Sequence, residues 1–201
     1  MVKKDNSSLR VKVALRRAFL PKDARVLDLF CGDGCMYRAV YRGHCAKYLG
    51  LDKVKTHDCR ICMIVDNQKW LSEQALAGFN VFDLDAYGSP LRMLQTIIAK
   101  MTEEEIVIFV TDGLPQTLMH CCNTAPPRIV RQVENLSDDW ALAGGISMYQ
   151  FYPQFFATLL KKCERAYRVR VSRWIFSWNP RHTCAYHALL IKACEVPRIA
   201  V

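Results

Sequence analysis

The chain has 201 residues, of which 51% are apolar and 23% are charged, and its formal net charge is +9. This length allows one domain with a substantial core, so we expect a single domain over residues 1–201. No run of about eighteen uncharged apolar residues occurs, which argues against a transmembrane helix. Residues 1–10 lack the apolar centre of a signal peptide, and we expect a flexible tail there.

Composition also bears on compartment and partners. Ten cysteines are many for this length, but several lie inside predicted strands and helices, where cysteine serves as a small apolar side chain. Cys59 and Cys62 form one CxxC pair with no second pair to complete a zinc site, so we expect no metal and reduced thiols in the cytoplasm. The positive charge favours a nucleic-acid partner, although a soluble basic protein would also carry it.

Apolar runs and helical spacing alternate along the chain. The predicted strands cover 25–30, 46–51, 64–65, 79–82, 106–110, 169–178 and 184–193. The predicted helices cover 36–42, 56–63, 67–77, 91–100 and 149–165, with Asn67 as a candidate helix cap. Residues 114–147 contain prolines and a Gly-Gly pair, so we expect an irregular insert. The alternation predicts an α/β fold with a mostly parallel sheet and an antiparallel C-terminal hairpin.

Two strand ends carry residues suited to a nucleoside ligand. The first strand runs into Asp28-Leu29-Phe30-Cys31-Gly32-Asp33-Gly34, and the second ends in Leu49-Gly50-Leu51-Asp52. Glycines allow a close approach of backbone to ligand, and a carboxylate at the second strand end can accept hydrogen bonds from a ribose diol. A third glycine at position 37 is absent, which disfavours a dinucleotide site. Alternatively, the glycines could form only a tight turn, and Asp52 could serve only as a helix cap.

A third strand end carries acids and an aromatic ring. Asp83-Leu84-Asp85-Ala86-Tyr87-Gly88-Ser89-Pro90 follows the strand predicted at 79–82. A carboxylate can hold an exocyclic amine and accept its proton, and an aromatic ring can stack on a base. A strand-to-helix turn would explain Ser89 and Pro90, but it leaves Asp83, Asp85 and Tyr87 without a role.

These strings resemble the class I methyltransferases that use S-adenosylmethionine (SAM). The resemblance implies their Rossmann-like fold with a seven-stranded sheet, and SAM as cofactor. It implies that Asp28 orients the glycine loop and the methionine amino group, that Gly32 and Gly34 pass beside SAM, and that Asp52 binds the ribose. Asp66 and Asn67 follow a short apolar stretch where adenine is contacted. The implied cofactor set is Asp28, Phe30, Gly32, Gly34, Asp52, Lys53, Asp66, Asn67 and Asp83.

The 83–90 segment is similar to the active-site string of the tRNA guanine-N2 dimethyltransferases, Asp-x-Asp-Pro-(Phe or Tyr)-Gly-Ser-Pro. The resemblance implies a catalytic pair, Asp85 to bind the amine and Tyr87 to stack on the base, with Asp83 in support. Ala86 stands where that family has proline. We therefore expect N-methylation of a guanine in tRNA. The alternatives are a DNA or protein acceptor, or an RNA-binding module with little turnover, and a protein partner could supply further RNA-binding surface.

Other polar groups allow two interpretations each. Thr111-Asp112-Gly113 could line the substrate pocket or make a turn, and His120 with Cys121 and Cys122 fits helix packing better than a nucleophile. Basic residues in the C-terminal half could contact phosphate, whereas the aromatic residues among them fit a core better. These basic residues are Arg128, Arg131, Lys161, Lys162, Arg165, Arg168, Arg170 and Arg173.

Overall fold

A computed structural model of the chain describes residues 8–54, 59–120 and 148–194. Its seven-stranded sheet has the order β3-β2-β1-β4-β5-β7-β6. The strands are β1 (Arg25–Asp28), β2 (Lys47–Asp52), β3 (Cys62–Ile64), β4 (Val81–Asp85), β5 (Glu105–Asp112), β6 (Val169–Trp178) and β7 (Ala185–Ala193). All neighbouring pairs are parallel except those of β7 with β5 and β6. The predicted Rossmann-like α/β fold, mostly parallel with an antiparallel C-terminal hairpin, is confirmed.

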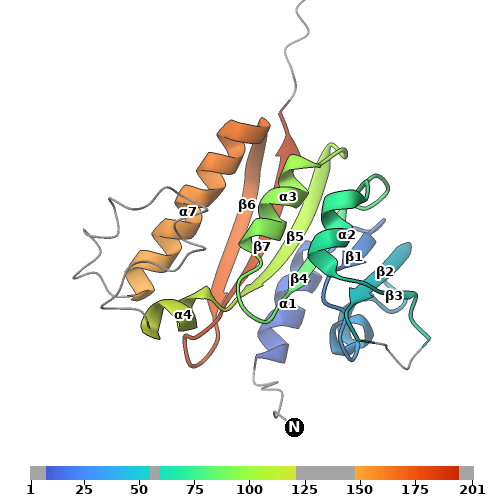
Figure 1. Cartoon of the computed structure of the whole chain (residues 1–201), viewed down its shortest axis with the longest axis horizontal. Helices are drawn as coiled ribbons and strands as arrows, with labels where there is room; N and C mark the ends of the chain where they lie inside the picture. Colours follow the sequence, from blue (N-terminus) through green and yellow to red (C-terminus); the bar gives the residue numbers. More distant parts are fainter. Residues whose placement is uncertain (1–7, 55–58, 121–147, 195–201) are drawn as a thin grey trace, which may run out of the picture.

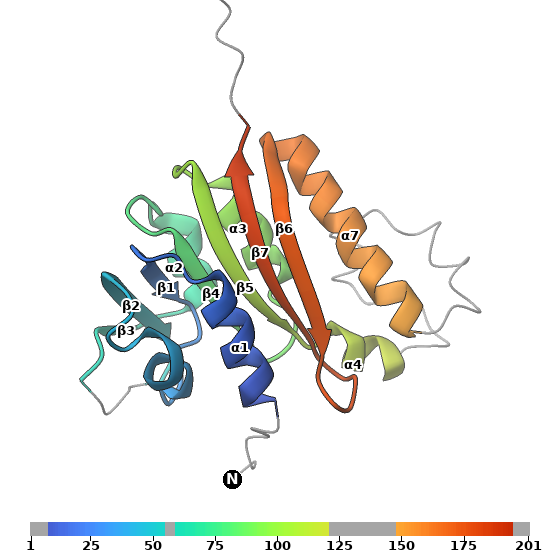
Figure 2. The same ribbon diagram turned by 180° about the vertical axis from the view of Figure 1, so that it is seen from behind.

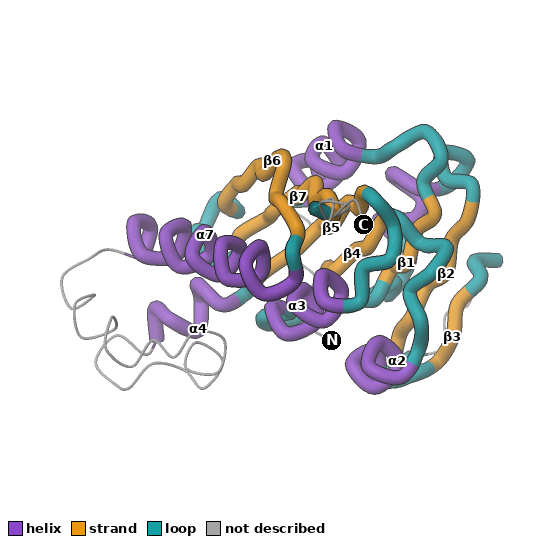
Figure 3. The backbone as a smooth tube through the Cα atoms, turned by 90° about the horizontal axis from the view of Figure 1, so that it is seen from above, coloured by secondary structure: helices purple, strands orange, loops and turns teal. Residues whose placement is uncertain are grey.

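Helices cover both faces of the sheet (Figures 1 and 2). One face carries α1 (Leu9–Phe19) and the π-helix η1 (Tyr37–Tyr41). The other carries α2 (Asn67–Glu73), α3 (Leu91–Ala99), α4 (Leu114–His120) and α7 (Met148–Tyr167). The view along the strands in Figure 3 shows these layers around the curved sheet. Because β5 is covered on both faces, its run from Ile106 to Asp112 is buried throughout.

Two apolar cores separate the layers. Leu91, Leu94, Ile97 and Ile98 of α3 are buried at the helical spacing that the sequence predicted, and they pack with α7 against one face of the sheet. On the other face, side chains of α1 and η1 pack with Val26, Val81 and Val107 of the central strands. This second core fixes α1 over the middle of the sheet, where its polar side chains can reach β4.

Several boundaries differ from the prediction. Helix α1 begins at Leu9, so Leu9 and Arg10 are not part of a tail; the buried Leu15 and Phe19 favour the helix. The helix predicted at 56–63 is wrong over 59–63, because Cys62 and Met63 belong to the edge strand β3 beside β2, whereas the strand predicted at 64–65 is confirmed at Ile64; residues 55–58 lie outside the described part. Likewise, 114–120 form α4 instead of irregular chain, and 121–147 are not described.

Strand β4 is the most consequential difference. We predicted a strand at 79–82 followed by a turn, but the strand covers Val81–Asp85 and includes both Asp83 and Asp85. The β4 backbone pairs with β5 as far as Asp85 opposite Thr111, and with β1 as far as Asp83 opposite Asp28. Pairing with neighbours on two sides extends the strand past its apolar run, and it places the two acids on the same side of the sheet.

Candidate active site

The candidate site is the edge of the sheet where the parallel strands β1, β2 and β4 end. Asp28 of β1 pairs in register with Gly50 of β2 and with Asp83 of β4, so the segments after these strands leave the sheet side by side. In Figure 1 this edge is the lower one, near the described start of α1 and the β6–β7 turn. Ligands of open α/β sheets bind at this edge.

The glycine loop (residues 31–34) is bonded to the end of β2. The Gly32 N–H donates to Oδ2 of Asp52 (2.8 Å), and Oδ1 of Asp52 accepts from the Val54 N–H (3.0 Å). Gly32 has φ 45° and Gly34 has φ 78°, a conformation that glycine adopts at little cost. The structure thus brings together the two segments that the sequence predicted to share one ligand.

Arg60 anchors this loop and was missed by the sequence reading. Its guanidinium donates to the carbonyls of Cys31 (2.8 Å) and Gly32 (2.9 Å), and it lies over the Tyr37 ring. A Cβ on Gly34 would come within 2.6 Å of the Arg60 Cζ, so a larger residue would displace this guanidinium as well as strain the backbone at φ 78°. No local signal marks Arg60, because the contact joins the segment before β3 to the loop after β1.

Asp28 lies beneath the glycine loop and is buried. Its Oδ1 accepts from the Phe30 N–H (3.1 Å) and its Oδ2 accepts from the Tyr48 hydroxyl (2.8 Å). Burial, together with the nearby charge of Asp83, raises the pKa of Asp28 to about 8. These contacts match a residue that shapes the loop, which is one of the two roles expected of Asp28.

Asp83 forms a buried ion pair with α1. The Arg16 guanidinium donates to both carboxylate oxygens, Nε to Oδ2 (2.7 Å) and Nη2 to Oδ1 (2.5 Å), and the Tyr41 hydroxyl also donates to Oδ2 (2.5 Å). The Asp83 side chain is 0% exposed. The sequence predicted Asp83 to touch a cofactor, but in this structure its carboxylate is enclosed by Arg16 and Tyr41 and has no exposed surface.

Asp85, two residues further along β4, lies at the rim of the sheet edge. Its side chain is 22% exposed, and its Oδ1 accepts from the Lys12 ammonium at 2.5 Å. Burial would raise the pKa of Asp85, but Arg16 and Lys12 outweigh it and hold the pKa below its usual value. The predicted amine-binding acid is thus ionised and reachable from solvent.

The loop after β4 carries Tyr87 into solvent. This residue is 87% exposed, so its ring face can accept a stacked base. The carbonyl of Gly88 accepts from the Gly113 N–H (2.8 Å), which ties this loop to the end of β5. A Cβ on Gly113 would come within 3.2 Å of Gly88, so glycine at position 113 permits this approach.

Asp112 ends β5 and begins a buried chain of hydrogen bonds. Trp174 Nε1 can only donate, so Nδ1 of His187 accepts (3.1 Å) and its proton is on Nε2. That Nε2–H then donates to the Tyr152 hydroxyl (2.9 Å), which donates to Oδ2 of Asp112 (2.7 Å). Burial lowers the pKa of His187 to about 3, so the ring is neutral. Oδ1 of Asp112 accepts from the Leu114 N–H (2.9 Å), which matches the turn interpretation.

The start of α2 separates the roles of two neighbours. The helix cap is Asp66, whose Oδ1 accepts from the Lys69 N–H (2.9 Å), and not Asn67 as predicted. The other oxygen of Asp66 pairs with exposed Lys53 (2.8 Å). Asn67 is buried and its amide nitrogen donates to the Leu29 carbonyl, while its Oδ1 has no hydrogen-bond partner within the described residues. Asn67 thus holds a buried, unpartnered acceptor beside the end of β1.

Other candidates pack in the core or lie outside the described part of the chain. Aromatic residues near the C-terminal basic cluster, such as Tyr152, Trp174 and Trp178, pack in or against the core, as predicted. Residues Cys121, Cys122, Arg128 and Arg131 lie outside the described part of the chain. Within the described ranges, no cluster of three or more His, Cys, Asp or Glu residues could hold a metal, and no helix is long and apolar enough to cross a membrane.

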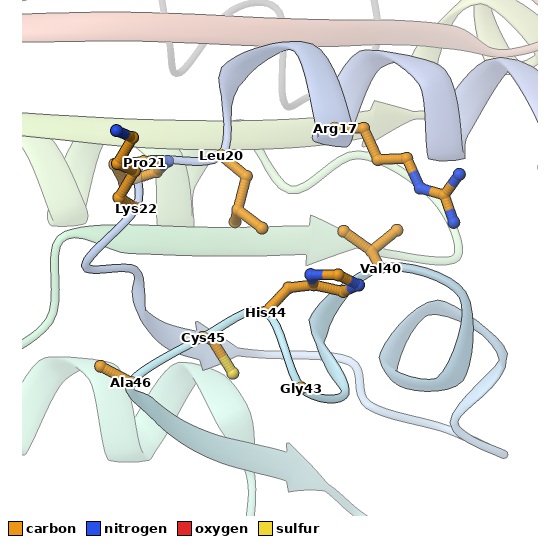
Figure 4. A pocket seen from close by; sticks show the side chains of 9 residues that line it. All are labelled: Arg17, Leu20, Pro21, Lys22, Val40, Gly43, His44, Cys45 and Ala46. Atoms are coloured by element: carbon orange, nitrogen blue, oxygen red, sulfur yellow. The ribbon is translucent and has the colours of Figure 1, made fainter.

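A surface hollow of about 820 Å³ lies at the opposite edge of the sheet (Figure 4). Its walls come from the end of α1 and from the segments before β1 and β2, where His44 and Leu20 face each other across it. The hollow is therefore distinct from the candidate site, which lies where the parallel strands end.

Sequence comparison gives no relative, since no family model matches the chain and no curated protein matches it at a significant level. Solved structures do match its fold. TYW2 from M. jannaschii, in complex with AdoMet, superposes with a TM-score of 0.60 over 96% of this chain and 78% of that one, at 8% identity. P. horikoshii TYW2 in complex with MeSAdo gives 0.51 over 96% and 64%, at 14% identity.

Trm5b from Pyrococcus abyssi gives a TM-score of 0.54 at 11% identity. The match covers 96% of this chain but 51% of Trm5b, so the chain spans about half the length of that protein. At these identities the likeness establishes a shared Rossmann-like fold, and the chemistry has to be argued from the residues at the strand ends.

Proposed function

We propose that the protein is a SAM-dependent methyltransferase that acts on RNA, with the exocyclic amine of a guanine in tRNA as the favoured acceptor. The observation that carries the proposal is the convergence at one sheet edge of the glycine loop, Asp52 and Asp85. The glycine loop and Asp52 would bind a nucleoside cofactor, and Asp85 would bind an amine acceptor beside it.

The residues at the edge fit SAM. Gly32 and Gly34 would lie beside it, Asp52 would accept from the ribose hydroxyls, and the segment that starts at Asn67 would contact adenine. Phe30, Lys53 and Asp66 stay in the proposed set because they flank these three segments. When bound, SAM supplies an electrophilic methyl group on its sulfonium. That the M. jannaschii TYW2 neighbour was solved with AdoMet supports this cofactor.

Asp85 and Tyr87 would handle the acceptor. The lone pair of an exocyclic amine is delocalised into its base, so the amine is a weak nucleophile. The Asp85 carboxylate would accept an N–H bond from the amine, hold it in line with the methyl group, and take the proton that nitrogen releases after transfer. The Tyr87 ring would hold the base by stacking.

The choice of RNA is supported by charge and by the active-site string. The net charge of +9 favours a polyanion, and Asp83, Asp85, Tyr87, Gly88, Ser89 and Pro90 match the pattern of the guanine-N2 enzymes. The string argues for a base amine over a protein side chain, because a stacking ring next to the acid suits a flat acceptor.

The proposal is tested with labelled SAM and separate pools of tRNA, DNA and protein. We expect label in the tRNA pool. Asp85→Ala should abolish transfer with SAM affinity unchanged, and Asp52→Ala should weaken SAM binding measured by calorimetry. Asp23→Ala, an exposed acid before β1, is the matched control and should change neither. SAM binding that is unaffected by Asp52→Ala would remove the ribose assignment.

A second function is favoured by one residue. Ala86 stands where the resembling enzymes have proline, which restricts the loop and aims a carbonyl at the amine. A chain that kept the fold and lost turnover would bind RNA without methylating it. Tight binding of tRNA with no label transferred from SAM, in the same assay, would favour this function over the first.

A further inference from the structure

Helix α1 places a cation directly on Asp85, the proposed amine-binding acid. The Lys12 ammonium lies 2.5 Å from Oδ1 of Asp85 and 5.4 Å above the centroid of the Tyr186 ring. The side chains of Lys12 and Asp85 are both largely buried, with 20% and 22% exposed. Solvent and salt screen an ion pair at this depth less than a surface pair, so the positive charge of Lys12 acts strongly on the Asp85 carboxylate.

The helix and the strand match each other in spacing. Lys12 and Arg16 are four residues apart on α1, a rise of about 6 Å, and Asp83 and Asp85 are two residues apart on β4, a rise of about 6.6 Å. Each cation therefore faces one acid. Arg16 also donates to the Lys12 carbonyl (3.2 Å), so the buried Arg16–Asp83 pair fixes the turn of helix that carries Lys12.

We propose that Lys12 is a positioning residue for methyl transfer, which orients the Asp85 carboxylate and keeps it ionised so that it can accept a hydrogen bond from the acceptor amine. This inference depends on the proposed function. An ionised carboxylate has about four acceptor sites, so one bond from Lys12 leaves capacity for the amine. A protonated Asp85 would be a weaker acceptor and could not take the proton that the amine releases.

The charged and titratable groups around Asp85 determine whether its pKa rises or falls when the Lys12 charge is removed. Lys12 and Arg16 face it from α1, Asp28 and Asp83 from the neighbouring β1 and its own β4, and the Cys184 thiol from the residue just before β7. Arg16 is already paired with Asp83. Removing the Lys12 charge would therefore leave Asp85 with weaker compensation for its burial, and its pKa would rise.

The test is the pH profile of kcat/KM for methyl transfer to tRNA. In Lys12→Met we expect the acid limb to move to higher pH by about one unit, the size of shift that a neighbouring charge produces. Lys12→Arg should keep the limb in place. Arg10→Gln removes the same charge from an exposed position on the same helix, and it should leave the limb unchanged.

A second measurement keeps the inference separate from the proposed function. Carbon-13 NMR of labelled aspartate reports the pKa of Asp85 directly, and Lys12→Met should raise it whether or not the chain transfers methyl groups. Failure of the wild type to methylate RNA would overturn the proposed function alone. A Lys12→Met variant that is folded by circular dichroism and keeps the wild-type Asp85 titration and pH profile would overturn the role of Lys12.

Discussion

Arg16 and Asp83 are 67 residues apart in the chain and form a buried, two-bond ion pair, and the Tyr41 hydroxyl donates a third hydrogen bond to the carboxylate. The pair joins α1 to the central strand β4 under the candidate site. A buried charge of this kind is tolerated only while its partner is present, since an unpaired ion in an apolar interior is costly. The orientation of α1, and with it the place of Lys12, depends on this contact.

Arg16→Met should therefore destabilise the fold severely. The substitution keeps the volume approximately but leaves the Asp83 carboxylate buried without its cation, at a cost of about 3–5 kcal/mol in the free energy of unfolding. Urea unfolding followed by circular dichroism measures it. Arg17→Gln, at an exposed neighbouring position, should change stability by less than about 0.5 kcal/mol. Equal effects of the two variants would contradict the importance of the pair.

Tyr152→Phe tests the buried chain that ends at Asp112. The variant removes the hydroxyl that accepts from His187 and donates to Asp112, so both lose a partner while the ring packing remains. We expect a loss of about 1–3 kcal/mol in stability. Tyr167→Phe, at a residue that is 40% exposed, serves as control and should be close to neutral. Wild-type stability in Tyr152→Phe would show that the chain contributes little.

Asp28 should make stability depend on pH. The unfolded chain releases its proton near the ordinary pKa of 3.8, whereas the folded chain holds it up to about 8. Between these values the folded state binds more protons, so the free energy of unfolding falls as pH rises. Asn mimics the protonated acid and cannot ionise, so Asp28→Asn should gain stability relative to wild type across this range. Urea unfolding at several pH values measures the difference, and parallel curves would contradict it.

Gly50→Ala tests the packing between the glycine loop and β3. A Cβ at this position would lie 2.8 Å from both Cys31 Cβ and Cys62 Sγ, and this crowding should cost about 1–3 kcal/mol. Adding Cys62→Ala removes one of the three clashes, since Cys31 Sγ also lies only 2.9 Å from the added Cβ. The double variant should therefore be less destabilised than the sum of the single ones in thermal unfolding. Strict additivity would mean that the loop yields elsewhere.

Much of the sheet edge could be predicted from the sequence, for a physical reason. Apolar runs mark buried strands, and the carboxyl ends of neighbouring parallel strands lie together, so Gly32, Asp52 and Asp85 could be assigned to one place before any coordinates. The first two residues of the short edge strand Cys62–Ile64 were mistaken for helix, because three residues carry too little periodicity to separate strand from helix.

The cations of the site could not be predicted in this way. Lys12, Arg16 and Arg60 act on residues that are 28 to 73 positions away, and nothing in their own neighbourhoods distinguishes them from surface residues. Asp83 illustrates the same limit, since its sequence context fits a ligand-facing turn and only the packing of α1 reveals a buried ion pair. Local sequence patterns show at which strand end a residue lies. Only its tertiary partners determine whether the side chain is free to contact a ligand.

The position of β7 in the sheet affects how the chain folds during its synthesis. It is the last strand along the described chain, yet it is hydrogen-bonded between β5 and β6. A nascent polypeptide can therefore assemble the first five strands while β5 still offers an open row of backbone amides and carbonyls. This exposed apolar edge is a point of vulnerability to aggregation or chaperone capture, until Ala185–Ala193 leave the ribosome and fill the gap.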